Sequence, residues 1–232
     1  MYKKALKRLS KGKWILSLLV VTWVVYGYML LYSLPHLIEL ANGMKPLDVL
    51  PTGYSSDYVR SLFLALGEGG RQFYLSRQIP IDMVYPALFI ITYSLLTFYG
   101  LCKAGTNESL ATRLSLIPVF AGICDYLENL GIVVMLWSFP DVSSSLATIT
   151  SCFSVGKAGL TTVFWIVLLY ALVAAVIRAT RGRMREVWLT VACRTLAGRH
   201  DPKDHDKISC PCPTASGCSV RITLPPDTLS QL

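Results

Sequence analysis

The chain has 232 residues and a formal net charge of +8, with 53% hydrophobic residues and only 16% charged residues. Soluble domains carry about 25% charged residues, and the mean hydropathy of +0.49 is strongly positive, so the composition excludes an ordinary soluble domain. The basic surplus comes without any nucleic-acid-binding motif, and we therefore expect no nucleic-acid partner.

Four long apolar segments predict four membrane spans. In chain order they cover about residues 14–34, 83–102, 114–138 and 145–177. Each is long enough to cross a hydrocarbon core of about 30 Å at about 1.5 Å per residue. Backbone groups in lipid must be satisfied within their own segment, so each span is expected to be helical. The predicted fold class is therefore all-α, as a membrane four-helix bundle.

These spans divide the chain into three parts. Residues 1–13 form a basic N-terminus, residues 14–180 the transmembrane domain, and residues 181–232 a basic, largely disordered tail. The apolar run of the first span has about 20 residues, whereas the apolar part of a signal peptide has about 7–15. We therefore interpret the first span as an uncleaved anchor that ends before Pro35.

Positive charge is unevenly distributed among the segments that flank the spans. The N-terminus, the second connecting segment and the tail are rich in basic residues, whereas residues 35–82 contain only Lys45, Arg60, Arg71 and Arg77. Lysine and arginine collect on the cytosolic side of membrane proteins, which places both termini in the cytosol and residues 35–82 outside. The same charges favour membrane lipids as partners, and a membrane-protein partner or a homo-oligomer stays open.

The outer loop between the first two spans carries helix signals of its own. The run Ser55-Ser56-Asp57 is a candidate N-cap for a short apolar helix at about residues 58–66. The glycine-rich residues 67–70 should interrupt this helix, and a second short helix is expected at about residues 71–77. We therefore predict a short amphipathic helical cap in this loop. Pro86 is expected in the first turn of the second span, where its missing N–H has no cost.

The third span contains Asp125, Glu128 and Asn129 in the middle of an apolar run. Spacings of three and four residues put all three side chains on one face of a helix. Asp125 lies about 12 residues from the cytosolic edge, or about 18 Å, which is near the bilayer midplane. Lys157 in the fourth span falls at a similar depth, and a charge in the bilayer interior requires a partner. We therefore expect Lys157 to pair with the Asp125/Glu128 face.

Four further residues are expected near this cluster. Asp82 and Tyr85 lie at the outer start of the second span, and Arg71 and Tyr74 lie in the loop before it. Because these segments meet on the same side of the membrane, we predict one polar pocket in the outer half of the bundle. The predicted site residues are Asp125, Glu128, Asn129, Lys157, Asp82, Tyr85, Arg71 and Tyr74.

The same residues carry a resemblance to a group of proteins. The chain contains Gly70-Arg71-Gln72-Phe73-Tyr74-Leu75, Asp82-Met83-Val84-Tyr85-Pro86 and Asp125-Tyr126-Leu127-Glu128-Asn129. These runs resemble the patterns G-R-x-x-Y-L, D-x-x-[FY]-P and D-x-x-E-N of small four-span membrane proteins of unknown function, in which a lysine-bearing span follows. The resemblance covers about residues 53–178 and departs from the pattern by one extra glycine before the arginine. It implies the same eight site residues and no particular activity.

The chemistry of the predicted site leaves three functions open. The leading hypothesis is binding of a lipid head group or small amphiphile. The second is a membrane-embedded acid–base enzyme or proton-coupled carrier, because two close carboxylates can divide acid and base roles. The third is a non-catalytic structural or assembly subunit. No nucleophile motif accompanies the carboxylates, and neither a cofactor nor a metal is expected: His200, His205, Cys210 and Cys212 lack a standard zinc spacing.

Overall fold

The computed structural model describes residues 2–9 and 12–197, with side chains up to residue 191. Within these residues the chain is helical and contains no strand. Four helical segments in this part of the chain are long and apolar enough to span a membrane: Gly12–Leu40, Ser56–Ala104, Glu108–Ser138 and Ser144–Val191. Each contains one of the predicted spans. The prediction of an all-α chain with four candidate membrane-spanning segments is therefore confirmed.

The helical elements follow one another with short connections. In chain order they are α1 (Tyr2–Leu9), α2 (Gly12–Tyr28), the π turn η1 (Met29–Ser33), α3 (Leu34–Leu40), the 3-10 turn η2 (Leu47–Val49), α4 (Ser56–Phe73), the π turn η3 (Tyr74–Gln78), α5 (Ile79–Ala104), α6 (Glu108–Leu114), α7 (Ile117–Ser138) and α8 (Ser144–Ala197). The residues up to Val176 form one compact unit, and those from Ile177 onward form a second.

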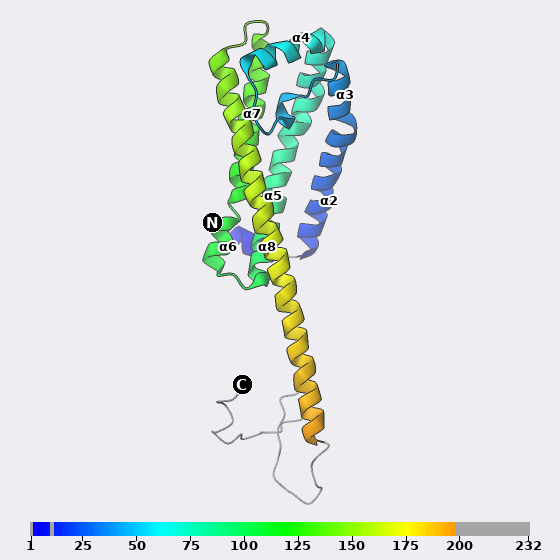
Figure 1. Ribbon diagram of the computed structural model, residues 1–232, viewed down its shortest axis with the longest axis vertical. Coiled ribbons are helices and arrows are strands. Elements are labelled where there is room, and N and C mark those ends of the chain that lie inside the picture. The colour runs from blue at the N-terminus through cyan, green and yellow to red at the C-terminus, as the bar shows by residue number, and fades with distance from the viewer. Residues whose placement is uncertain (1, 10–11, 198–232) are drawn as a thin grey trace, which may run out of the picture. The chain divides into compact units, whose positions relative to one another are not determined.

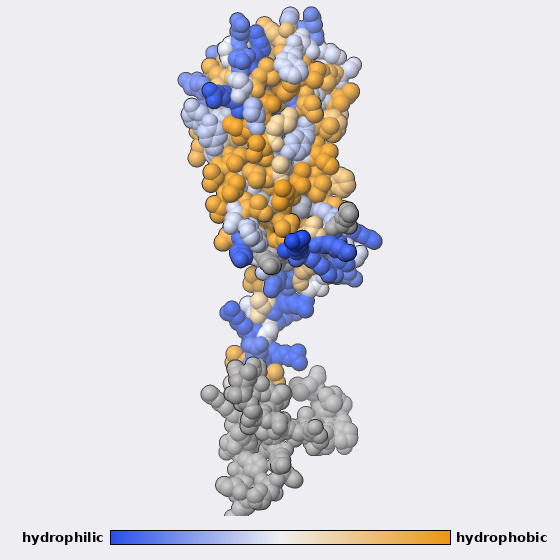
Figure 2. All heavy atoms as spheres, turned by 180° about the vertical axis from the view of Figure 1, so that it is seen from behind, coloured by the Kyte–Doolittle hydropathy of each residue, from blue (hydrophilic) through white to orange (hydrophobic). Residues whose placement is uncertain are grey.

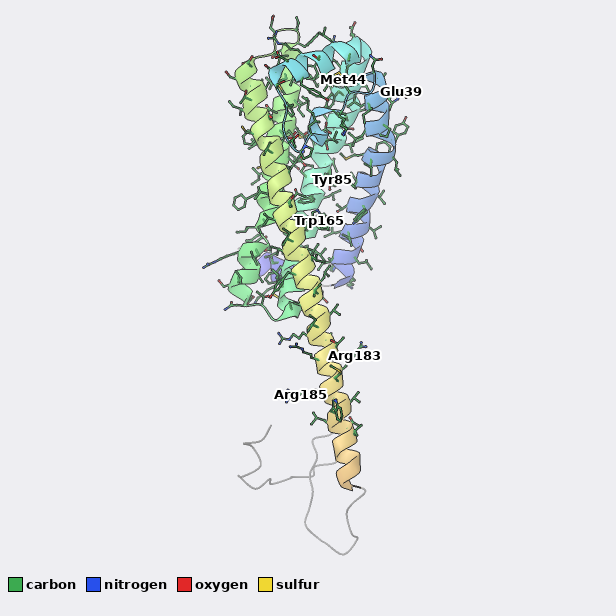
Figure 3. The ribbon with its side chains drawn as sticks, viewed as in Figure 1. Glu39, Met44, Tyr85, Trp165, Arg183 and Arg185 are labelled. Atoms are coloured by element: carbon green, nitrogen blue, oxygen red, sulfur yellow. The ribbon has the colours of Figure 1, made fainter. Side chains whose placement is uncertain are left out.

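The second unit begins with the C-terminal part of α8. Its basic side chains, including Arg183 and Arg185, are exposed (Figure 3). The predicted tail starts at residue 181, inside this helix, and the helix continues to Ala197. Residues 198–232 lie outside the described residues, and with them the tail residues His200, His205, Cys210 and Cys212.

In the first unit, α2, α5, α7 and the first part of α8 run side by side (Figure 1). α5 packs against both α2 and α7. Phe164 of α8 packs against Phe89 and Tyr93 of α5, with ring centroids 5.6 and 5.0 Å apart. α3 and α4 lie near one end of this unit, and α1 and α6 lie near the other (Figure 1). The long helices therefore enclose a common interior.

The face of the first unit that Figure 2 shows is mostly apolar over its middle and hydrophilic at its two ends. Many large apolar side chains of this unit are exposed, among them Leu31 and Trp137, which are 81% and 74% accessible. Soluble proteins rarely expose continuous apolar surface on this scale. Exposed apolar surface of this extent is compatible with four helices that are apolar enough to cross a membrane.

α4 begins and bends where the sequence predicts. Ser55 Oγ accepts a hydrogen bond from Tyr58 N at 3.2 Å, which confirms the N-cap. Gly67 has φ of +61°, a left-handed conformation that favours glycine, and it marks a kink inside the helix. One face of α4 is buried, since Phe63 belongs to the same apolar cluster as Ile132 of α7.

Two expected helix interruptions are absent. Helical structure continues past Pro35, and residues 71–77 join α4 to α5 without forming a separate helix. In each place a π turn precedes a proline. Proline cannot donate to the carbonyl four residues earlier, and the π turn shifts the hydrogen-bond register in front of it. Leu34 N accordingly bonds to Met29 O, and Ile79 N bonds to Tyr74 O. The two π turns, η1 and η3, contact each other.

Candidate functional site

Pro86 explains why the D-x-x-[FY]-P run of α5 contacts the D-x-x-E-N run of α7. It lies in the interior of α5, so the prediction that it occupies the first turn is wrong. An interior proline leaves the carbonyl four residues earlier, Asp82 O, without its helical donor and disturbs the next one, Met83 O. Asn129 Nδ2 donates to Asp82 O at 2.9 Å, and Tyr126 Oη donates to Met83 O at 2.9 Å. The D-x-x-E-N run of α7 therefore supplies the donors that the D-x-x-[FY]-P run of α5 lacks.

Lys157 of α8 forms the expected ion pairs with α7. Its Nζ lies 3.1 Å from Asp125 Oδ1 and also pairs with Glu128. Glu128 is fully buried, and Asp125 is only 8% exposed. α7 and α8 approach closely beside this pair, because a Cβ atom on Gly131 would overlap Thr150 of α8. The pairing predicted from depth is therefore present in the structure.

Residues 48–54 of the first loop lie along α8, where three polar side chains spaced three residues apart hold them. Three hydrogen bonds join the two segments: Ser151 Oγ accepts from Tyr54 N (2.8 Å), Ser154 Oγ donates to Leu50 O (3.0 Å) and Lys157 Nζ donates to Asp48 O (3.2 Å). A spacing of three places these α8 side chains on one helix face. Non-helical backbone at membrane depth is tolerated where protein buries it or a cavity adjoins it. These three hydrogen bonds place Asp48 between the helices.

Asp48 is the centre of a second polar network. Tyr74 Oη donates to Asp48 Oδ1 at 2.6 Å, and Gln78 Nε2 donates to Asp48 Oδ2 at 3.2 Å. Gln78 Nε2 also donates to Asp82 Oδ2 at 3.1 Å, while Ser33 Oγ donates to Gln78 Oε1 at 2.6 Å. Tyr74, Gln78, Asp82 and Ser33 are all buried. The network therefore ties both π turns and the start of α5 to the inserted loop.

A cavity of about 440 Å³ adjoins these networks. Its polar lining includes Asp48, Asp82, Asp125 and Lys157. Its apolar lining comes mainly from α2, η1, α3 and α5: Tyr26, Met29, Leu30, Leu34, Tyr85 and Phe89. Tyr85, labelled in Figure 3, stacks on Tyr26 with ring centroids 5.4 Å apart, so α5 and α2 meet at this wall. The cavity lining therefore combines acidic side chains with aromatic and aliphatic ones.

The structure brings most of the predicted site residues to this region. Asp125, Lys157, Asp82 and Tyr85 line the cavity, and Glu128, Asn129 and Tyr74 belong to the networks beside it. Arg71 is placed elsewhere. Its Nη1 donates to Phe63 O at 2.8 Å, and its guanidinium lies 4.3 Å from the ring centroid of Phe139. Arg71 therefore fixes α4 and does not line the cavity.

Sequence reasoning missed several residues of the site, chief among them Asp48 and Gln78. Gln78 stands four residues before Asp82, a spacing that predicts contact on a helix, and this signal could have identified it. Asp48 lies in a loop between prolines, and no pattern in the sequence shows that the loop folds inward. Among the described residues, buried Glu128 Oε1 and Asn129 Oδ1 have no hydrogen-bond partner.

No family model, no curated protein and no solved structure matches the chain. Among the residues that the structure describes, no group of three His, Cys, Asp or Glu side chains has the geometry of a metal site. Tyr54, which precedes α4, is mostly buried beside the acidic cluster, and burial raises the pKa of its hydroxyl well above the usual value. This hydroxyl therefore stays protonated at neutral pH.

Proposed function

We propose that the chain is a multi-pass integral membrane protein, with a four-helix bundle whose outer end is capped by α4 and whose termini are both cytosolic. The apolar middle of the first unit and its four long apolar helices support a membrane setting. The distribution of basic residues supports the orientation. In this orientation the loop that carries Asp48 enters the bundle from the outer side.

Within this bundle we propose that the cavity binds the head group of a lipid or a small amphiphile. The observation that carries the proposal is the mixed lining, with Asp48, Asp82 and Asp125 facing the same space as Tyr85 and Phe89. Ligand sites are concave, mostly apolar and carry a few convergent polar groups, and volumes of about 300–1,000 Å³ are usual. A molecule with a polar head and an apolar chain matches both kinds of lining residue.

The contacts suggest different roles for the residues around the cavity. Asp82 and Asp125 would face the ligand head, and Lys157 would act as the countercharge that keeps Asp125 and Glu128 compatible with burial. Asn129 would be structural, because its donor is used on the carbonyl that Pro86 frees. Arg71 of α4 would not contact an anion in the cavity.

The alternative of a structural or assembly subunit is favoured by one observation. Lys157 pairs with two carboxylates and a loop carbonyl without any ligand, as expected for a cluster that only fixes helix register. The cavity distinguishes the two functions, since a purely structural cluster has no need of an adjoining space lined by further carboxylates.

The test is the retention of lipid by the purified protein. Native mass spectrometry of protein extracted in a mild detergent should detect a bound amphiphile in the wild type and much less in Ala158→Phe, which fills the cavity. Ile166→Phe is the matched control, because Ile166 lies on the same helix and is 64% exposed. Equal retention in both variants, or none in the wild type, would contradict amphiphile binding.

A further inference from the structure

We propose that the occupant of this cavity is a single-chain amphiphile with a cationic amine head, which reaches the cavity from the lipid between α2 and α8. The inference rests on the proposed function and adds the charge of the head, the number of chains and the route. Three features of the cavity carry it: an excess of carboxylates, an aromatic wall and an exposed apolar rim.

The polar lining has more acidic than basic side chains. Asp48, Asp82 and Asp125 line the cavity, and Lys157 is the only Lys or Arg among its lining residues in the described part of the chain. The ammonium of Lys157 is already shared by Asp125, Glu128 and Asp48 O. Buried carboxylates without countercharge are costly, so a cationic ligand would be favoured over a neutral or anionic one.

Specific acceptor atoms are available for such a head. Asp82 receives its hydrogen bond from Gln78 on Oδ2, and Asp125 receives that of Lys157 on Oδ1. Asp82 also shares a hydrogen bond with the side chain of Asp48, whereas the second oxygen of Asp125 accepts no hydrogen bond from another described residue, and both residues line the cavity. An ammonium group has three donors and no acceptor, which matches a lining of carboxylate oxygens in which that of Asp125 is free.

The aromatic part of the lining suits an aliphatic chain beside a cation. Tyr85 lies between Tyr26 and Phe89, with ring centroids 5.4 and 6.0 Å away. Aromatic faces attract ammonium groups within about 6 Å of the ring centroid and also pack against methylene groups. The volume of about 440 Å³ lies in the lower part of the range for small-molecule sites, which favours one chain over two.

The rim of the cavity faces the apolar surface. Tyr26 and Leu30, on the α2 side, are 37% and 50% exposed, and Thr162, on the α8 side, is also exposed. α2 packs against α5. A ligand dissolved in the bilayer therefore meets an apolar opening at this depth, whereas a hydrated solute would have to cross lipid to reach it.

The test is a competition among amphiphiles with one chain length and different heads. Wild-type protein in lipid nanodiscs is equilibrated with equimolar dodecylamine, dodecanol and dodecyl phosphate, and bound adducts are counted by native mass spectrometry. We expect the amine adduct to exceed either competitor at least tenfold. Asp82→Asn, which keeps the side-chain shape and leaves the Lys157 pairs intact, should reduce the amine adduct about tenfold.

The route is tested at the rim. Leu30→Trp should reduce the amine adduct at least fivefold, whereas Leu31→Trp should not, because Leu31 is 81% exposed and does not line the cavity. Preference for dodecanol or dodecyl phosphate would overturn the cationic head and leave amphiphile binding intact. Equal effects of the two tryptophan variants would overturn the route. If none of the three compounds binds, the proposed function fails with the inference. Should Asp82→Asn not fold, the wild-type ranking of heads still decides the matter.

Discussion

Removal of the Lys157 ammonium tests whether the charge cluster stabilises the helices. In Lys157→Met, Asp125 and Glu128 lose their countercharge while both stay buried. Removing one partner of a buried ion pair costs about 3–5 kcal/mol. The lost hydrogen bond to Asp48 O adds about 1 kcal/mol. The Lys157 side chain is 20% exposed, so we expect the lower end of the combined range, about 4 kcal/mol.

The assay is reversible unfolding in mixed micelles of mild detergent and dodecyl sulfate, followed by circular dichroism. Lys45→Met is the control, since the Lys45 side chain is exposed and forms no ion pair with another described residue. Its effect should stay within about 0.5 kcal/mol.

The neutral triple variant provides the decisive comparison. Lys157→Met combined with Asp125→Asn and Glu128→Gln removes both signs of charge, so about 2 kcal/mol of the loss should return. Residues in contact show coupling energies of about 0.5–3 kcal/mol, whereas independent sites add. Simple additivity of the charge-neutralising effects would refute the reasoning that the pair compensates buried charge.

Three further outcomes are expected. Asn129→Leu should destabilise the protein by about 1–3 kcal/mol, because Asp82 O loses its donor. The loss should be smaller in a Pro86→Ala background, since alanine at this position restores a helical N–H donor. An equal loss in both backgrounds in the same unfolding assay would contradict this explanation. Ser154→Ala should cost about 1 kcal/mol and accelerate hydrogen exchange of the inserted loop, since its bond to Leu50 O is lost; unchanged exchange rates would show that the loop is held by other contacts. Epitope tags at the two termini should both resist protease in sealed, right-side-out vesicles and become sensitive on lysis, and sensitivity of either tag before lysis would overturn the orientation.

Several features of the fold follow from local sequence signals. Runs of apolar residues identify the four candidate spans, because segment length and hydropathy are properties of the chain alone. The Ser55 cap and the Gly67 kink follow from backbone preferences that act within a few residues. The helix interruptions predicted at Pro35 and before the second span are absent, since π turns accommodate the prolines.

Part of the candidate site follows from depth and helical spacing. These place Asp125, Glu128 and Lys157 together because the partners stand on regular helices whose rise per residue is known. Asp48 was not predictable in this way, since its position depends on hydrogen bonds between a loop and α8 that are distant in sequence. Arg71 shows the opposite error. It is predicted as a site residue because it belongs to a sequence pattern, but its guanidinium donates to a carbonyl of its own helix.

Covalent mapping of the bound ligand tests the central claim most directly. Wild-type protein in nanodiscs is irradiated with dodecylamine that carries a diazirine next to the amine, and modified peptides are identified by mass spectrometry. The account predicts adducts concentrated on Asp82 and Asp125, or on Asp48 in the inserted loop, that excess unlabelled dodecylamine removes. Adducts confined to exposed positions outside the cavity such as Trp137, or labelling that unlabelled amine does not reduce, would contradict binding in the cavity.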